Sequence, residues 1–169
     1  AVITATSAAG KTAEYKITVK TPSVKLNVSA KTLYVKGSPA TVALKATKAG
    51  ISGNVTYTSS KVSVATVDAN GKVTAKAAGT AVITAKCGNY KATCKITVKK
   101  PSVKASASAK TVYVGKTSQI KVTKTGLTGK VTYTSSNKAI AAVSKNGKVT
   151  AKKAGTATIT VKCGSYKVT

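Results

Sequence analysis

The sequence lacks histidine, methionine, tryptophan, phenylalanine and arginine, and its only acidic residues are Glu14 and Asp68. General acid–base catalysis usually depends on histidine or on paired carboxylates, and a tetrahedral zinc site needs four cysteine, histidine or carboxylate ligands. A serine–lysine dyad is the one catalytic arrangement left open, and chance proximity explains such pairs in a chain rich in both residues. We therefore expect a protein that is not an enzyme and uses no cofactor or metal ion.

The basic residues are all lysines, and the 29 of them give a formal net charge of +27. One interpretation is attraction to a polyanion such as an anionic surface glycan or a cell-wall polymer. The other is a solvated face that keeps the protein soluble and protects its sheet edges. Without arginine for bidentate phosphate contacts, and with few aromatic residues for base stacking, we expect no specific nucleic-acid recognition. The candidate polyanion contacts are Lys86, Lys95, Lys99, Lys100, Lys162 and Lys167.

Internal repetition is the dominant feature of the sequence. Six motifs of one segment recur in the same order in a later segment. The matching pairs are Pro22–Lys25 with Pro101–Lys104, Ala30–Val35 with Ala109–Val114, Val55–Ser60 with Val131–Ser136, Asn70–Lys76 with Asn146–Lys152, Ala78–Ala81 with Ala154–Ala157, and Cys87–Gly88 with Cys163–Gly164. The later copy is three residues shorter between Tyr113 and Val131, which predicts a trimmed loop between two strands.

A third, partial copy opens the chain, because Lys16–Lys20 repeats Lys95–Lys99 residue for residue. We expect the C-terminal strand pair of a preceding module at 1–20, a complete module at 21–100, and a module that lacks much of its last strand at 101–169. The two joints are only a few residues long, and each ends in proline, which cannot donate to a continuing strand ladder. The string of modules should therefore be fairly stiff.

Short apolar runs separated by turn residues predict an all-β fold with about seven or eight strands per module. In the complete module the predicted strands lie near 23–29, 32–36, 40–47, 54–58, 62–67, 72–76, 80–87 and 92–99. The segment Asp68–Gly71 has too few carboxylates for a calcium loop and is predicted to be a turn with Gly71 at positive φ. Such a density of strands is typical of an immunoglobulin-like β-sandwich, so we expect such sandwiches in tandem.

Period-two alternation separates the two faces of the last strands in the complete module. The inward residues are Ala81, Ile83, Ala85, Cys87, Cys94, Ile96 and Val98. An antiparallel register that pairs Ile83 with Val98 and Cys87 with Cys94 brings both inward sets onto one face.

This register predicts a disulfide between Cys87 and Cys94, which the chain-entropy model values at roughly 2–3 kcal/mol. By the same repeat, Cys163 should have a cysteine partner just beyond Thr169. The alternative is that Cys87 and Cys94 are free thiols, which are small and apolar enough to be buried.

The segment Gly71–Lys76 followed by Ala78–Thr84 resembles the signature of bacterial immunoglobulin-like domains of group 2. The preceding Tyr57–Ser60 and Val64–Asp68 fit the same pattern, whereas Ile140–Ser144 departs from it slightly. The resemblance covers the whole chain. It implies a role as spacer or adhesive module, as in intimin- and invasin-like adhesins, Gram-positive surface proteins and phage virion proteins, and it brings no catalytic residues.

The function expected first is a semi-rigid, adhesive or structural stalk in an extracellular protein of the bacterial cell surface. One alternative is a subunit of a filament, a surface layer or a phage particle, and another is a lysine-rich module that binds anionic glycan or wall polymer. No stretch of about 18 apolar residues is present, so we expect no membrane insertion in this segment.

Neighbouring copies of the same module are the expected partners, with a homopolymer through strand pairing as a further arrangement. A simple strand exchange fits incompletely, because residues 1–20 bring two strands and residues 101–169 lack one. Excision from a longer array explains both ends with fewer assumptions.

Overall fold

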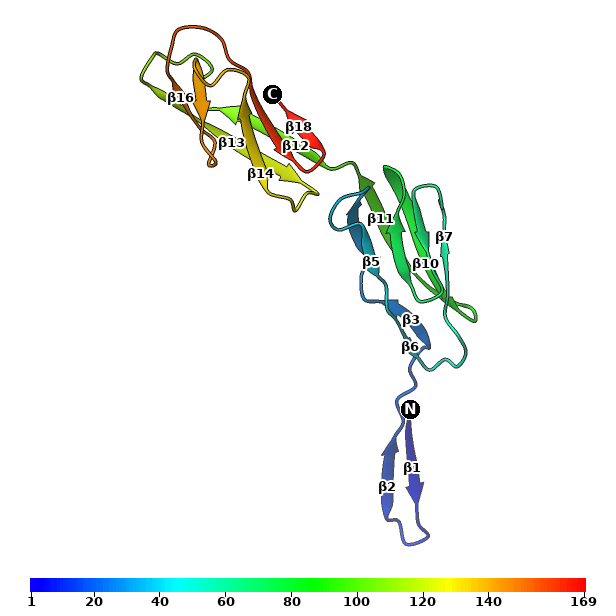
Figure 1. Ribbon diagram of the computed structural model, residues 1–169. Coiled ribbons are helices and arrows are strands. Elements are labelled where there is room, and N and C mark those ends of the chain that lie inside the picture. Colours follow the sequence, from blue (N-terminus) through cyan, green and yellow to red (C-terminus); the bar gives the residue numbers. More distant parts are fainter.

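A computed structural model describes residues 1–169 as an all-β chain of eighteen strands without a helix. Figure 1 shows three bodies that follow one another in an extended row. We call them the N-terminal hairpin (1–20), the central module (21–100) and the C-terminal module (101–169). The structure contains no helix that is long and apolar enough to cross a membrane.

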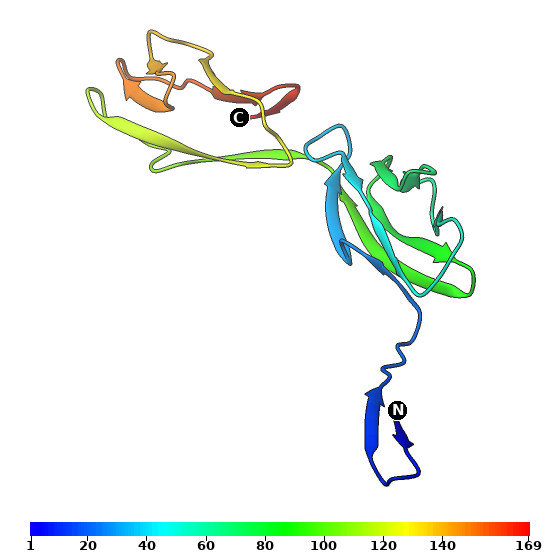
Figure 2. The same ribbon diagram turned by 90° about the horizontal axis from the view of Figure 1, so that it is seen from below.

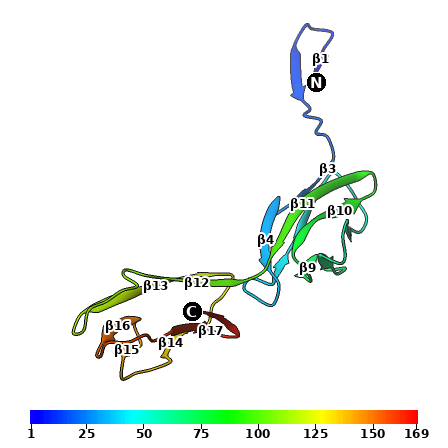
Figure 3. The same cartoon turned by 90° about the horizontal axis from the view of Figure 1, so that it is seen from above.

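The N-terminal hairpin consists of β1 (Val2–Thr6) and β2 (Thr12–Lys16), which pair antiparallel. Its turn is closed by a hydrogen bond of 2.8 Å from the Ser7 amide to the Lys11 carbonyl. Every residue of both strands is exposed, because no second sheet covers either face. Figure 3 shows that a single extended segment joins the hairpin to the central module.

The central module is a sandwich of two layers. Its strands are β3 (Ser23–Leu26), β4 (Ala30–Tyr34), β5 (Thr41–Ala43), β6 (Ala46–Ala49), β7 (Thr56–Ser59), β8 (Ala65–Val67), β9 (Lys72–Ala75), β10 (Gly79–Cys87) and β11 (Tyr90–Lys99). One layer has the order β4–β11–β10–β7, and the other combines β3–β6 with β5–β9–β8. The sandwich of many short strands confirms the predicted all-β, immunoglobulin-like class.

The predicted strand 40–47 is divided in two, which raises the number of strands in the module to nine. Its first part, β5, pairs with β9, and its second part, β6, pairs with β3. At the division the Leu44 amide donates to Gly71, and the Lys45 amide donates to the Asn27 side chain at 2.8 Å. The chain thus changes its neighbour at Leu44–Lys45, and the side chain of Asn27 replaces a ladder partner.

The core of the central module lies between the layers and draws on both. Leu33, Leu44, Ile83 and Ile96 are at most 1% exposed and form one cluster with Val73 and others. The inward residues predicted for β10 and β11 are all buried, so period-two alternation assigned their faces correctly.

The C-terminal module repeats this sandwich with β12 (Ser102–Ala107), β13 (Thr117–Thr125), β14 (Val131–Ser135), β15 (Ala141–Val143), β16 (Lys148–Ala151), β17 (Ile159–Cys163) and β18 (Tyr166–Val168). One layer is β12–β13–β16–β15, and the other is β14–β17–β18. Figure 2 shows these layers facing each other. The second layer has no strand at the position that β4 holds in the central module.

The predicted register between β10 and β11 is wrong. Ile83 pairs with Cys94 rather than with Val98, and Cys87 pairs with Tyr90. The strands are joined by a two-residue turn with Gly88 at φ 57°, a position where tight hairpins favour glycine. The shift from the predicted register is four residues. Because four is even, every side chain keeps its face, and the apolar pattern alone cannot distinguish the two registers.

Candidate functional site

The cysteines do not form the predicted disulfide. All three thiols are free and buried. Cys87 pairs with Tyr90 and Cys94 pairs with Ile83, so the two cysteines are separated by four residue pairs along the β10–β11 ladder. At roughly 3.4 Å per residue, that separation exceeds the ~7 Å Cα limit for a disulfide. Burial raises the pKa of the Cys94 thiol above its ordinary value, which favours the uncharged, unreactive form. The cysteines therefore act as core residues.

The six candidate lysines are all exposed, but they do not form one cluster. Lys86 lies on β10 and Lys95 on β11, whereas Lys162 and Lys167 lie on β17 and β18 of the other module. Lys86 stands directly opposite Lys91, and Lys162 stands directly opposite Lys167. The same lysine–lysine pair thus recurs on the outer face of both modules.

The Asp68 carboxylate stabilises a turn by accepting backbone hydrogen bonds. Its Oδ1 accepts hydrogen bonds from the Asn70 and Lys72 amides at 3.0 and 2.9 Å, and Gly71 has φ 78°. In the C-terminal module the Ser144 hydroxyl accepts the matching pair of bonds. A neutral hydroxyl replaces the carboxylate in the same geometry, so the charge of Asp68 is not needed for the turn.

The junction between the two modules is a compact contact. The Ser38 amide donates to the Gly126 carbonyl at 3.0 Å, and Pro101 is buried in the joint. A Cβ added to Gly37 would lie 2.5 Å from Pro101, and one added to Gly126 would overlap the ring of Tyr34. The two glycines therefore permit a close approach that any side chain would block. Figure 3 shows β11 running directly into β12 at this point.

The sequence predicts short joints but does not by itself identify the residues of this junction. A signal was present, because Pro22 and Gly50 of the central module hold the repeat positions of Pro101 and Gly126. Because this proline and this glycine recur at the same end of both modules, they indicate that this end contacts the preceding module.

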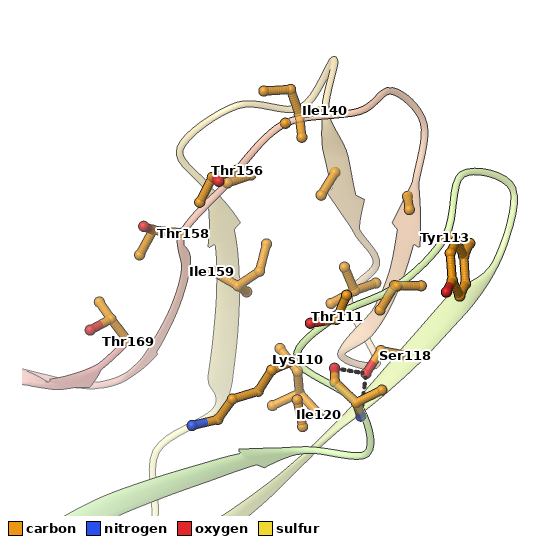
Figure 4. Close-up of a pocket in the computed structure, with 18 of the residues that line it drawn as sticks. Lys110, Thr111, Tyr113, Ser118, Ile120, Ile140, Thr156, Thr158, Ile159 and Thr169 are labelled. Carbon is orange, nitrogen blue, oxygen red and sulfur yellow. Dashed lines mark hydrogen bonds between the residues drawn. The ribbon is translucent and has the colours of Figure 1, made fainter.

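The C-terminal module contains a groove of about 790 Å³ between its two layers. Figure 4 shows residues of the Lys110–Ile120 segment on one side and Thr156, Thr158 and Ile159 on the other. Ser118 at its base is 4% exposed, and its hydroxyl donates to the Ala109 carbonyl at 2.7 Å and accepts from the Ala109 amide at 3.1 Å. The groove offers apolar walls and no cluster of His, Cys, Asp or Glu that could hold a metal ion.

The equivalent space in the central module is filled by β11. Its Cys94, Ile96 and Val98 side chains are at most 2% exposed, and its backbone pairs with β10 on one side and with β4 on the other. In the C-terminal module the counterparts of β4 and of the first half of β10, residues 109–113 and 155–158, are not strands. The groove therefore lies where the second half of β11 packs in the central module.

Two family models match the chain. Residues 53–100 match the model described as bacterial Ig-like domain, and residues 98–167 match the bacterial Ig-like domain of group 2. The second match falls on the C-terminal module, whose Ile140–Ser144 departs slightly from the group's pattern. No curated protein matches the chain.

Among solved structures, the S-layer protein rSbsC(31-844) is 25% identical over 88% of this chain, with a TM-score of 0.54. The chain spans 26% of the length of that structure. SbsC domains 4 and 5 are 25% identical over 88% of this chain and 94% of that one, with a TM-score of 0.53. An EHEC O157:H7 intimin mutant matches 52% of this chain and 51% of that one at 23% identity, and its TM-score of 0.36 is too low to support any argument.

Proposed function

The chain belongs to the bacterial immunoglobulin-like domains, and we propose that it is a non-catalytic structural segment of a protein on the bacterial cell surface. In this role consecutive modules form a semi-rigid stalk or a strut of a surface layer. The similarity to two consecutive domains of the S-layer protein SbsC supports an extracellular, structural setting.

The observation that carries this proposal is the junction between the central and C-terminal modules. A joint of a few residues would act as a hinge if the modules made no contact. Here Ser38 bonds to Gly126, and Tyr34 and Gly37 pack against Gly126 and Pro101. Such contacts restrict rotation at the joint, and a spacer that holds its partners at a fixed separation requires restricted rotation.

The test replaces Gly126 with alanine. The added Cβ would overlap the Tyr34 ring, so we expect the modules to separate and to tumble more independently. Residual dipolar couplings should then give different alignment tensors for the two modules, and small-angle scattering should report a broader range of shapes.

Gly50→Ala is the matched control. Gly50 has φ 64° and Gly126 has φ 66°, so alanine meets the same backbone strain at both positions. A Cβ at Gly50 would lie 3.7 Å from Pro22, an ordinary contact. If Gly126→Ala and Gly50→Ala left the modules equally rigid relative to each other, the junction would not be a structural contact and the stalk proposal would fail.

A second candidate role, binding of an anionic polymer, is favoured by the repeated lysine pairs. Like charges directly opposite each other on a sheet are destabilising, and an anion bound between Lys86 and Lys91 would relieve that repulsion. Heparin and polyphosphate are suitable probes. Replacing Lys86, Lys91, Lys162 and Lys167 with glutamine should weaken binding and reduce its dependence on salt.

The control for the lysine pairs removes the same number of charges elsewhere. Lys72, Lys76, Lys148 and Lys152 hold equivalent positions in the two modules, and all are exposed. Equal loss of binding in both quadruple variants would show that net charge alone attracts the polymer, and would exclude a site at the pairs.

A further inference from the structure

A pocket of about 260 Å³ lies between the central and C-terminal modules, beside the hydrogen bond from Ser38 to Gly126. Figure 1 shows the turn that precedes β5 next to the loop that joins β13 to β14. The lining comes from residues 36–38 of the central module and from two turns of the C-terminal module, at 126–129 and 163–166. Pockets for drug-sized ligands have volumes of about 300–1,000 Å³, so this one suits a single small chemical group.

The charges around this pocket are positive. Lys36 lines it, whereas the two acidic residues of the chain, Glu14 and Asp68, do not. Lys124 brings a second ammonium group to the lining residue Gly129, because its Nζ donates to the Gly129 carbonyl at 3.0 Å. Two ammonium groups without a carboxylate attract an anion to this position.

The hydrogen-bonding groups of the lining also favour an anion. The Gly129 carbonyl is already occupied, since it accepts from the Lys124 Nζ and from the Cys163 thiol at 3.0 and 3.2 Å. The amides at 127–129 and at 164–165 are donors in no backbone hydrogen bond. Free backbone amides in turns are a common means of binding anions. The pocket therefore suits a ligand that accepts hydrogen bonds and donates none.

The backbone of Lys36 is strained at this position. Its φ is 50°, and it is the only residue other than glycine with a positive φ. Lysine rarely adopts this left-handed region. The counterpart in the C-terminal module is Gly115, which has φ 83° and adopts the same region without strain. Strained residues of this kind are concentrated at functional sites, so a lysine where glycine would fit better indicates a use for its ammonium group.

We propose that this pocket binds a phosphate group, either as inorganic phosphate or as part of a polymer. The Lys36 ammonium group supplies a charge-assisted hydrogen bond, and the amides at 127–129 and 164–165 supply neutral donors. A phosphate group presents three acceptor oxygens, which suits donors on three separate turns, whereas a carboxylate presents two oxygens.

This site is distinct from the lysine pairs of the second candidate role. None of the four paired lysines lines the pocket, and its donors come from both modules rather than from one outer face. The inference rests on the contact at the junction and does not depend on the cell-surface role.

The test follows the backbone amide signals of the full chain by NMR while inorganic phosphate replaces chloride at constant ionic strength. Constant ionic strength keeps the screening of the other lysines unchanged. We expect saturable shifts confined to residues 36–38, 126–129 and 163–166. A second titration with polyphosphate distinguishes the source of the group. Tighter binding at the same residues would assign the site to a polymer, and equal affinity per phosphate group would assign it to free phosphate.

Lys36→Asn removes the ammonium group but keeps a residue that tolerates positive φ, so the turn should fold unchanged. We expect the affinity for phosphate to fall roughly tenfold, because a hydrogen bond from a charged donor is lost. Lys116→Asn is the matched control. Lys116 is exposed in the corresponding turn of the C-terminal module and lies outside the pocket, so the same charge change there should leave the affinity unaltered.

Two results would overturn the proposal. One is an equal affinity for phosphate in Lys36→Asn and Lys116→Asn. The other is a set of shifts that spreads over the lysines of both modules without saturation, because general attraction to a chain of net charge +27 would then explain the binding.

Discussion

The central and C-terminal modules share many residues at matching positions, yet a segment that is a strand in one is not a strand in the other. Ala30–Tyr34 forms β4 in the central module, whereas its counterpart, residues 109–113, forms no strand. Leu33 is fully buried, and its counterpart Val112 is half-buried. The difference is explained by the adjacent strand. β4 is an edge strand whose only pairing partner is β11. A strand at a sheet edge exists because an adjacent strand satisfies its backbone groups.

The two modules also differ where one strand changes its pairing partner within a layer. In the central module β5 and β6 are separate, and the Tyr57 hydroxyl bridges the break by donating to the Leu44 carbonyl and accepting from the Ala46 amide. In the C-terminal module β13 is continuous, although it pairs first with β16 and then with β12. One topology thus tolerates both a broken and an unbroken strand, and a side chain compensates for the break.

The largest effect should come from Leu33, which is more deeply buried than its counterpart Val112 in the other module. Leu33→Ala removes a fully buried side chain and should destabilise the central module by about 2–5 kcal/mol. Val112→Ala acts on a half-buried residue beside the groove and should cost about 1 kcal/mol or less. Urea denaturation with hydrogen exchange read separately for each module would measure both. Equal costs would mean that the groove is closed in solution.

A smaller effect should follow from loss of the tyrosine bridge. Tyr57→Phe leaves the Leu44 carbonyl and the Ala46 amide without this partner and should cost about 1 kcal/mol. The counterpart change, Tyr133→Phe, removes no such bridge because β13 is unbroken, and its effect should be near zero. Thermal unfolding of the two variants compares them directly, and a larger loss in Tyr133→Phe would contradict this account of the strand break.

The smallest effect should be a pH dependence confined to the central module. Burial raises the pKa of Cys94, so the unfolded thiol, with an ordinary pKa of about 8.5, ionises first as the pH rises. The stability of the central module should therefore be constant below that pH and should fall as the pH rises through the folded-state pKa. Cys94→Val should remove this fall, as monitored by urea midpoints from neutral to alkaline pH. A fall that persists in Cys94→Val would assign it to other groups.

The rate at which the Cys94 thiol is alkylated gives an independent measurement of its burial. Cys94 should resist alkylation by iodoacetamide until the module unfolds, because the reagent needs an accessible thiolate. Rapid alkylation under native conditions would show that β11 separates from its neighbours.

Much of the fold followed from the sequence where a local pattern carried the information. Repeats such as Val55–Ser60 with Val131–Ser136 located the equivalent strands β7 and β14, and alternation placed Ile83 and Ile96 inward. The register of β10 with β11 did not follow, because a shift of four residues preserves every inward position. The disulfide prediction failed with it, since Cys87 and Cys94 share a face but not a rung.

The sequence by itself determined that this protein is a tandem array of β-sandwiches without the usual groups for acid–base catalysis, because repetition, period-two alternation and the absence of histidine are local properties. Only the tertiary structure decided which strands are neighbours, where Tyr34 and Gly126 join two modules, and where the C-terminal module leaves a groove. These features depend on backbone groups far apart in the chain, and a backbone hydrogen bond forms only when the fold brings its two partners together.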